Sequence, residues 1–172
     1  MSLTRYIKKL SPAMAIAFST CSSAAALPAN MDLTINRIGA SKDISSFVLP
    51  LGNTVNMNGT AIYQGVAAVF IAQAYGIPVT PTMALMIVLS ATLASIGTAG
   101  VAGAGAIMLS MVLHTVGLPI EGVGLIFGID RIYDMGRTAM NITGDSVVAA
   151  IISKQEKEFD EKIWNTDFAK DE

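Results

Sequence analysis

The sequence predicts an all-α membrane protein with two re-entrant helical hairpins, one broken helix and one continuous transmembrane helix, arranged as an inverted repeat. Three observations support this fold class. The chain is 52% hydrophobic and only 14% charged, whereas soluble domains carry about 25% charged residues. Between Ile44 and Ile129 the only charged residue is Glu121. Glycine and proline divide that run, so it contains several short segments rather than one span of about 20 residues.

The composition also excludes other classes of protein. Disordered chains are polar and charge-rich, and the mean hydropathy here is +0.56. The single cysteine, Cys21, rules out a disulfide framework or a cysteine-based zinc site within the chain. A net charge of −2 argues against nucleic acid as a partner. The apolar N-terminal stretch is serine-rich without a clean cleavage pattern, so we interpret it as a first membrane segment rather than a signal peptide.

Residues 6–39 predict the first re-entrant hairpin. Its arms, LSPAMAIAF and ANMDLTINRIG, are too short or too mixed to span a bilayer, and the small polar stretch STCSSAAALP lies between them. Lys8 and Lys9 flank one end of the hairpin, and Arg37 and Lys42 flank the other. Both ends are therefore expected on one side of the membrane. The alternative is a loose pair of amphipathic helices at the interface.

Residues 44–76 predict a broken helix. The stretch PLGNTVNMNGT at residues 50–60 contains three poor helix formers, Pro50, Gly52 and Gly59, and four polar side chains lie among them. Unwound backbone inside a membrane is tolerated only where protein, ions or a wet cavity receives its polar groups. A loop between two short helices is the alternative. The apolar continuation from Ala61 to Ala74 favours the broken helix.

Residues 81–118 predict the second re-entrant hairpin. Its arms, TMALMIVLSATLAS and AIMLSMVLHTVG, have at most about 14 residues, or ~21 Å of helix, against a core of ~30 Å. The tip between them, IGTAGVAGAG, has glycines too dense for the alternative, a helical dimerisation motif of small residues. The flanking loops contain no Lys or Arg, so this hairpin is expected to enter from outside.

The last membrane segment is expected at residues 120–152 and completes one domain over residues 1–152. Residues 153–172 form a polar tail whose lysines, Lys154, Lys157 and Lys162, place it in the cytoplasm. One hairpin then enters from inside and the other from outside. Transporters built from inverted repeats bind substrate and ions where such interrupted segments meet.

One face of the last helix is polar and charged. Steps of three and four residues place its six polar side chains within an arc of roughly 100°. Each central charge costs ~2.5–3.5 kcal/mol to insert, so the stripe must face a polar site. Its net charge of −2 calls for cations, and its arginine offers a fork for a carboxylate. An internal ion-pair network is the alternative. The stripe consists of Asp130, Asp134, Arg137, Thr138, Asn141 and Asp145.

Four motifs together resemble the C-terminal half of the dicarboxylate/amino acid:cation symporter family, the glutamate transporter homologues. They are STCSSAAALP, NMNGT (NMDGT in the family), SIGTAGVAGAG and DRIYDMGRTAMNITGD, in that order. The resemblance extends from about Tyr6 to Ser153 and identifies the domain as a partial transport domain.

The resemblance implies a substrate site for an acidic amino acid. Arg137 matches the residue that binds the side-chain carboxylate, and Asp134 matches the residue that takes the amino group. Because both are present, aspartate or glutamate is favoured over a plain dicarboxylate. The other matching substrate residues are Ser22, Ser23, Thr60, Val101, Gly103, Gly105, Thr138 and Asn141.

The resemblance also implies sodium as the coupling ion, with protons as the alternative, and no other cofactor. One sodium site matches Gly52, Asn56, Asn141 and Asp145; a second, built largely from backbone carbonyls, matches Thr54, Ser95, Ile96 and Thr98. Met57 lies between substrate and ions. Three departures stand out: Asn58 replaces an aspartate of a further sodium site, Cys21 replaces a serine, and Ala102 replaces a common proline.

We therefore expect the substrate- and cation-binding half of a symporter that works by alternating access in the cell (inner) membrane. Family members are more than twice as long, so a missing N-terminal scaffold, or homologous subunits of a trimer, are expected partners beside the lipid bilayer. The alternative is a truncated, non-transporting fragment or accessory subunit. An enzyme is not expected, because the lone histidine, His114, lies on an apolar hairpin arm without a partner base.

Overall fold

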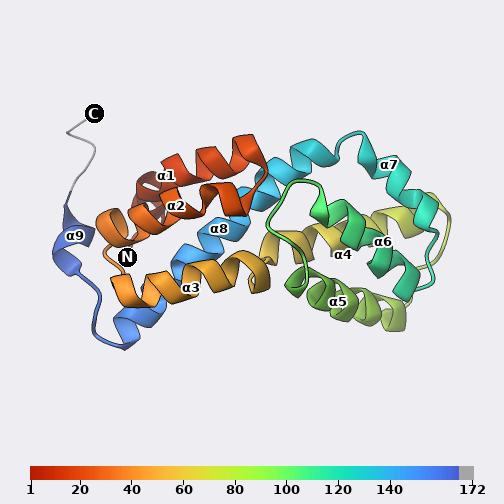
Figure 1. Cartoon of the computed structure of the whole chain (residues 1–172). Helices are drawn as coiled ribbons and strands as arrows, with labels where there is room; N and C mark the ends of the chain where they lie inside the picture. The colour runs from red at the N-terminus through yellow and green to blue at the C-terminus, as the bar shows by residue number, and fades with distance from the viewer. Residues whose placement is uncertain (167–172) are drawn as a thin grey trace.

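The computed structural model describes residues 1–166, and all regular secondary structure in this part of the chain is helical, which confirms the predicted all-α class. Figure 1 shows two groups of helices joined along α8. One group contains α1 (Leu3–Thr20), α2 (Ser23–Leu33), the π-helical turn η1 (Thr34–Ile38) and α3 (Lys42–Val55). The other contains α4 (Asn58–Ala74), α5 (Pro81–Ile96), α6 (Ala104–Thr115), the 3-10 turn η2 (Ile120–Gly122) and α7 (Val123–Phe127).

The helices α1 and α2 form a hairpin that largely overlaps the predicted range of 6–39, with α1 beginning earlier, at Leu3. Cys21 adopts a left-handed conformation with φ 52° and ends α1. Ser22 then caps α2, because its Oγ accepts a hydrogen bond from the backbone N–H of Ala25 at 3.2 Å. The turn is therefore shorter than the stretch STCSSAAALP predicted, since α2 absorbs most of that stretch.

The predicted break in the second segment lies at Asn56 and Met57, between α3 and α4. Both residues have non-helical ψ values near 60°. The second hairpin consists of α5 and α6, and its tip runs over residues 97–103. Gly103 enters α6 with φ +81°, a conformation that favours glycine.

The last segment is not the continuous helix predicted over residues 120–152. The chain forms η2 and α7, breaks at Gly128 and Ile129, and continues as α8 (Asp130–Gln155). Glycine is a poor helix former, and Asp130 in the first turn of α8 suits the positive end of the helix dipole. A short helix, α9 (Glu161–Asn165), lies within the predicted tail; residues 167–172 of that tail lie outside the described residues.

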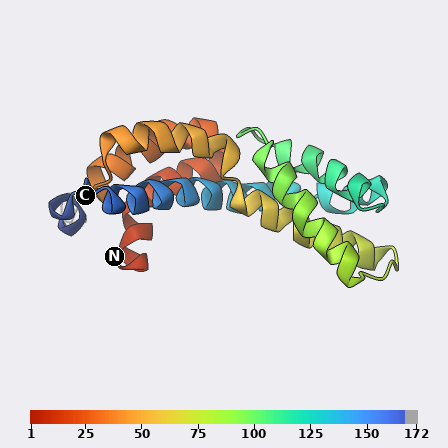
Figure 2. The same ribbon diagram turned by 90° about the horizontal axis from the view of Figure 1, so that it is seen from below.

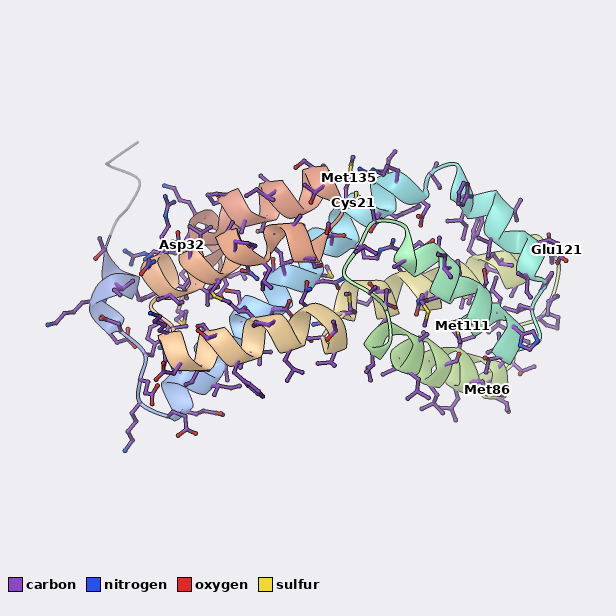
Figure 3. The ribbon with its side chains drawn as sticks, viewed as in Figure 1. Cys21, Asp32, Met86, Met111, Glu121 and Met135 are labelled. Carbon is purple, nitrogen blue, oxygen red and sulfur yellow. The ribbon has the colours of Figure 1, made fainter. Side chains whose placement is uncertain are left out.

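Each group of helices has its own apolar core. The first core includes Leu10, Ile38 and Ile142, and the second includes Ile71, Leu109 and Leu113. Figure 2 shows the resulting elongated shape. In Figure 3, Asp32 and Glu121 lie at opposite ends of the molecule. Among the described residues, no helix is both long enough and apolar enough to cross a membrane.

Candidate functional site

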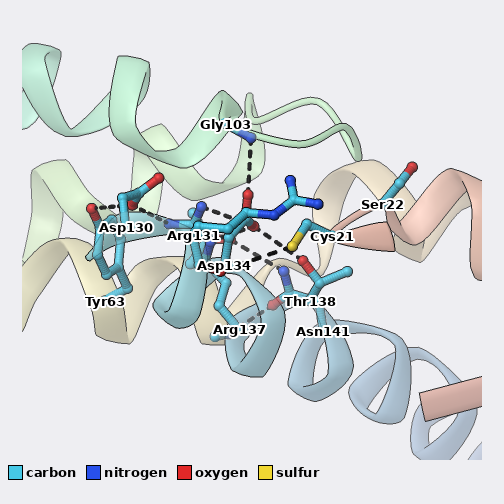
Figure 4. Close-up of polar contacts among 12 residues, drawn as sticks. Cys21, Ser22, Tyr63, Gly103, Asp130, Arg131, Asp134, Arg137, Thr138 and Asn141 are labelled. Atoms are coloured by element: carbon cyan, nitrogen blue, oxygen red, sulfur yellow. Dashed lines mark hydrogen bonds and ion pairs between the residues drawn. The ribbon is translucent and has the colours of Figure 1, made fainter. Parts of the chain in front are cut away.

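The candidate site lies where the two groups of helices meet. The break between α3 and α4, the tips of both hairpins and the polar face of α8 surround a small cavity of about 10 Å³. Figure 4 shows the polar residues that α8 contributes. The cavity brings together most of the predicted substrate residues. Its lining consists of Cys21, Ser23, Met57, Thr60, Thr98, Ala99, Gly100, Val101, Gly105, Asp134, Arg137, Thr138 and Asn141.

Asp134 is the best-connected carboxylate of the site. Its Oδ1 lies 2.9 Å from Nη2 of Arg137 and accepts hydrogen bonds from Nε of Arg137 and from Oγ1 of Thr138, each at 3.2 Å. Its Oδ2 accepts a hydrogen bond from the backbone N–H of Gly103 at 2.9 Å. Asp134 therefore connects α8 to the tip of the second hairpin (Figure 4).

Arg137 is held from its other side by Tyr63 and Asp130. Its guanidinium lies 4.4 Å from the centre of the Tyr63 ring, within range of a cation–π interaction. The Tyr63 hydroxyl donates to Oδ1 of Asp130 at 2.7 Å, and the same oxygen lies 3.8 Å from Nη1 of Arg137. Tyr63 is not among the site residues predicted from the sequence. Its position one helical turn after Thr60 was the available signal.

The guanidinium is incompletely satisfied. Arg137 is 7% exposed, yet neither Nη1 nor Nη2 has a hydrogen-bond partner among the described residues. Gly105 lies so close that a Cβ at that position would overlap the guanidinium. A buried guanidinium whose Nη1 and Nη2 donate no hydrogen bond among the described residues suits an additional anion, although Nη2 lies in an ion pair with Asp134. The absence of a side chain at Gly105 lets the second tip pack directly against this guanidinium.

Asn141 links the substrate residues to the helix break. Its Oδ1 accepts from the backbone N–H of Gly59 at 2.8 Å. Its Nδ2 donates to Oγ1 of Thr60 at 3.1 Å and to Sδ of Met57 at 3.2 Å. These bonds fix α4 against α8, with Met57 and Thr60 both buried at the cavity.

The two hairpin tips bond directly to each other. Oγ of Ser22 donates to the carbonyl of Gly100 at 3.0 Å, and the backbone N–H of Ala24 donates to the same carbonyl at 3.2 Å. Ser22 thus lies outside the lining of the small cavity, whereas Ser23 is buried within it. The side chain of Val101 is 55% exposed, although this residue also borders the cavity.

The first predicted sodium set is partly assembled around Asp145, which is 2% exposed. Nδ2 of Asn56 donates to its Oδ1 at 2.9 Å, and a Cβ at Gly52 would lie 2.5 Å from the same oxygen. The fourth residue of this set is Asn141, whose Oδ1 already accepts a hydrogen bond from the backbone N–H of Gly59. In the described part of the chain no three His, Cys, Asp or Glu side chains cluster to hold a metal ion.

The second predicted sodium set divides by exposure. Ser95 and Thr98 are buried, whereas Thr54 and Ile96 are exposed. The hydroxyls of Thr54, Ser95 and Thr98 all bond to carbonyls of their own helix region. Asn53, which the sequence analysis did not select, lies beneath the second tip with its buried Oδ1 unpartnered among the described residues.

The three departures from the family motifs occupy different surroundings. Asn58 is exposed, and its amide lies beside Gly144. Cys21 is buried, with Sγ 3.9 Å from the carbonyl oxygen of Arg131. Ala102 is exposed and borders a larger, open cavity of about 610 Å³ between α6, α7 and the start of α8, which also reaches Asp130 and Asp134.

Interrupted helices that meet at a buried, charged site are characteristic of ion-coupled membrane carriers. Comparison with known proteins agrees with this class. The family model described as the sodium:dicarboxylate symporter family matches residues 1–155, and the chain belongs to this family. Its members are transporters and not enzymes.

The relatives include amino acid symporters from several organisms. The chain is 42% identical to a proton/sodium-glutamate symport protein of Bacillus caldotenax over 94% of this chain and 38% of the relative. It is 40% identical to the proton/glutamate-aspartate symporter of Escherichia coli (strain K12), over 94% of this chain and 37% of the relative. It is 41% identical to human neutral amino acid transporter A, over 86% of this chain and 28% of the relative. The chain thus spans less than two fifths of the length of these relatives.

Proposed function

We propose that this chain is the substrate- and cation-binding part of a cation-coupled acidic amino acid symporter. The observation that carries the proposal is the buried guanidinium of Arg137, whose Nη1 and Nη2 donate no hydrogen bond among the described residues although they lie beside the carboxylates of Asp130 and Asp134. Buried polar groups usually have hydrogen-bond partners, so these donors suit a bound carboxylate.

The substrate we propose is aspartate or glutamate. Its side-chain carboxylate binds Arg137 as a forked pair, and its ammonium group binds Asp134. Thr138 and Asn141 lie on the same face of α8 and offer further polar contacts. The names of the relatives include glutamate, glutamate–aspartate and neutral amino acid transporters. The presence of both charged residues favours the acidic substrate.

The coupling ion we propose is Na⁺, with H⁺ as the alternative. Asp145 is buried without a cationic partner among the described residues and accepts only the neutral amide of Asn56. A buried carboxylate needs either a cation or a proton. The Bacillus caldotenax relative is named a proton/sodium-glutamate symport protein, so both ions are consistent with the family.

In the membrane, we propose that the α1–α2 and α5–α6 hairpins are re-entrant and enter from opposite sides, with the tail in the cytoplasm. Residues 1–152 then form part of a transport domain, and residues 153–172 lie outside it. For alternating access, we propose that an N-terminal scaffold or homologous subunits in a trimer complete the transporter. The relatives are much longer than this chain, which leaves room in their sequences for such a scaffold.

A second candidate function is an accessory or non-transporting subunit that packs against a longer homologue. The observation that favours it is the large number of exposed apolar side chains, such as Phe47, Val66 and Leu93, at 66–71% exposure. Lipid or a partner protein must cover such a surface.

Binding measurements separate the two candidates. The purified full chain in lipid nanodiscs, alone and with any co-encoded N-terminal half, is titrated with L-aspartate and L-glutamate in NaCl, in KCl and at several pH values. The symporter proposal expects saturable, sodium- or proton-dependent binding in at least one preparation. Absence of binding in all preparations, together with stable association with a full-length homologue, supports the accessory subunit instead.

A further inference from the structure

The segment after α8 folds back onto the outer end of the first helix group. Figure 1 shows α9 at that end of the molecule, far from the candidate site. Asp160 caps α9 by accepting hydrogen bonds from the backbone N–H groups of Lys162 at 2.8 Å and Ile163 at 3.1 Å. Trp164 is only 6% exposed and belongs to the same apolar core as Tyr6, whose ring lies 6.2 Å away. Burial of a tryptophan in a charged tail indicates a specific docked position.

Lys9 joins three elements through one ammonium group. It is 6% exposed, and its Nζ donates to the carbonyls of Arg37 at 2.7 Å, Ile163 at 3.0 Å and Trp164 at 2.7 Å. These carbonyls belong to the ends of η1 and α9, where helices have unsatisfied acceptors and partial negative charge. The ammonium also lies 5.0 Å from the centre of the Trp164 ring. Burial of a lysine ammonium costs far less free energy when its N–H groups donate to backbone carbonyls than when only apolar side chains surround it.

Additional bonds connect the same segment to the start of α3 and to α1. The backbone N–H of Asp160 donates to the carbonyl of Gly39 at 2.8 Å. Gly39 has φ +93°, and a Cβ there would lie 2.5 Å from the carbonyl oxygen of Asp160. Oγ of Ser41 donates to Glu158 at 2.6 Å, and the guanidinium of Arg5 donates to the carbonyl of Asn165 at 2.8 Å.

We propose that residues 158–166 form a C-terminal clasp that fixes both outer ends of the α1–α2–η1 hairpin to the end of α8. Residues 158–166 follow the part of the chain that the family model matches, 1–155. The clasp therefore lies beyond the region that the family model matches. It restrains this hairpin and leaves the α5–α6 hairpin untouched, so the two hairpins differ in mobility.

Hydrogen–deuterium exchange of the full chain in nanodiscs tests the clasp, without substrate or sodium. The variants are Lys9→Met, which keeps the length of the side chain and removes its donors, and Trp164→Ala. Lys162→Met is the matched control, because Lys162 is an exposed lysine of the same segment and no side-chain bond connects it to the hairpin. Both clasp variants are expected to speed exchange at least about tenfold over residues 3–13 and 34–41, with residues 104–115 unchanged.

Two outcomes overturn the clasp: unchanged exchange over residues 3–13 and 34–41, or an equal rise in every helix, which indicates general destabilisation. If the two buried variants fail to fold, Arg5→Ala is the variant that tests the clasp. Arg5 is half-exposed, so its replacement removes the hydrogen bond to the carbonyl of Asn165 without creating a buried cavity. A smaller rise confined to the same residues supports the clasp, and no rise overturns it. Because no ligand is added, failure here leaves the proposed transport function intact.

Discussion

Replacement of Arg137 by alanine tests the proposed substrate site most directly. The substrate carboxylate is expected to take the two guanidinium nitrogens that have no hydrogen-bond partner. Charge-assisted hydrogen bonds contribute ~1.5–3 kcal/mol each, so two of them contribute ~3–6 kcal/mol. Part of this is offset, because the substrate competes with Asp134, which lies 2.9 Å from Nη2. The lower end of the range is therefore expected, a loss of affinity of about 100-fold or more.

The assay is binding of radiolabelled L-aspartate at saturating sodium, with L-serine as a competitor that lacks the side-chain carboxylate. Arg137→Ala is expected to weaken aspartate binding by that factor without weakening serine binding. Arg137→Lys keeps the charge and loses the fork, so an intermediate affinity is expected. Arg131→Ala is the matched control, because Arg131 is an exposed arginine of the same helix. A folded Arg137→Ala protein with unchanged aspartate affinity would refute the proposed role.

Asp145→Asn is expected to raise the sodium concentration for half-maximal aspartate binding at least about tenfold. The reason is that a buried carboxylate contributes a negative charge that an amide lacks. An unaltered sodium dependence contradicts a cation site at Asp145. Gly105→Ala places a Cβ where the guanidinium of Arg137 lies, so aspartate binding should be lost. Gly136→Ala is the control, because a Cβ there has nothing within 4 Å. This variant should bind aspartate normally, with a melting temperature no lower than that of the wild type. Tyr63→Phe keeps the ring and removes the charge-assisted hydrogen bond from the Tyr63 hydroxyl to Asp130, which contributes ~1.5–3 kcal/mol. The affinity for aspartate is expected to fall about tenfold or more in the same titration. Wild-type affinity would show that the hydroxyl is dispensable.

The sequence predicted those parts of the fold that local spacing determines. The polar residues of α8 lie three and four positions apart, so their shared face follows from helix geometry alone. The break at Asn56 and Met57 and the tip at residues 97–103 follow from clustered glycine and asparagine. The break at Gly128 was not predicted, because isolated glycines within an apolar run are compatible with a continuous helix.

Contacts between distant segments were beyond local reasoning. Tyr63 and Arg137 belong to different helices, and only the fold brings the ring to 4.4 Å from the guanidinium. Similarly, Trp164 lies in a charged tail that resembles a solvated segment, and its burial depends on a pocket formed by α1 and η1. The family resemblance implies that Asp134 binds a substrate ammonium, and this stays a prediction; in the structure Asp134 pairs with Arg137.

The pairing of Asp134 with Arg137 bears on how a substrate enters the site. A cavity of about 10 Å³ holds no more than a water molecule, so this cavity between the two tips and α8 has no room for an amino acid. The second hairpin closes it through two contacts: the Gly103 N–H on Asp134 and the approach of Gly105 to the guanidinium. We expect withdrawal of this tip to release Oδ2 of Asp134 and uncover Arg137 together. We expect a substrate with both an ammonium group and a second carboxylate to replace both lost interactions, whereas a ligand with only one of these groups leaves a buried charge unpaired. We therefore predict that selectivity for acidic amino acids and closure of the tip depend on the same two residues, Asp134 and Arg137.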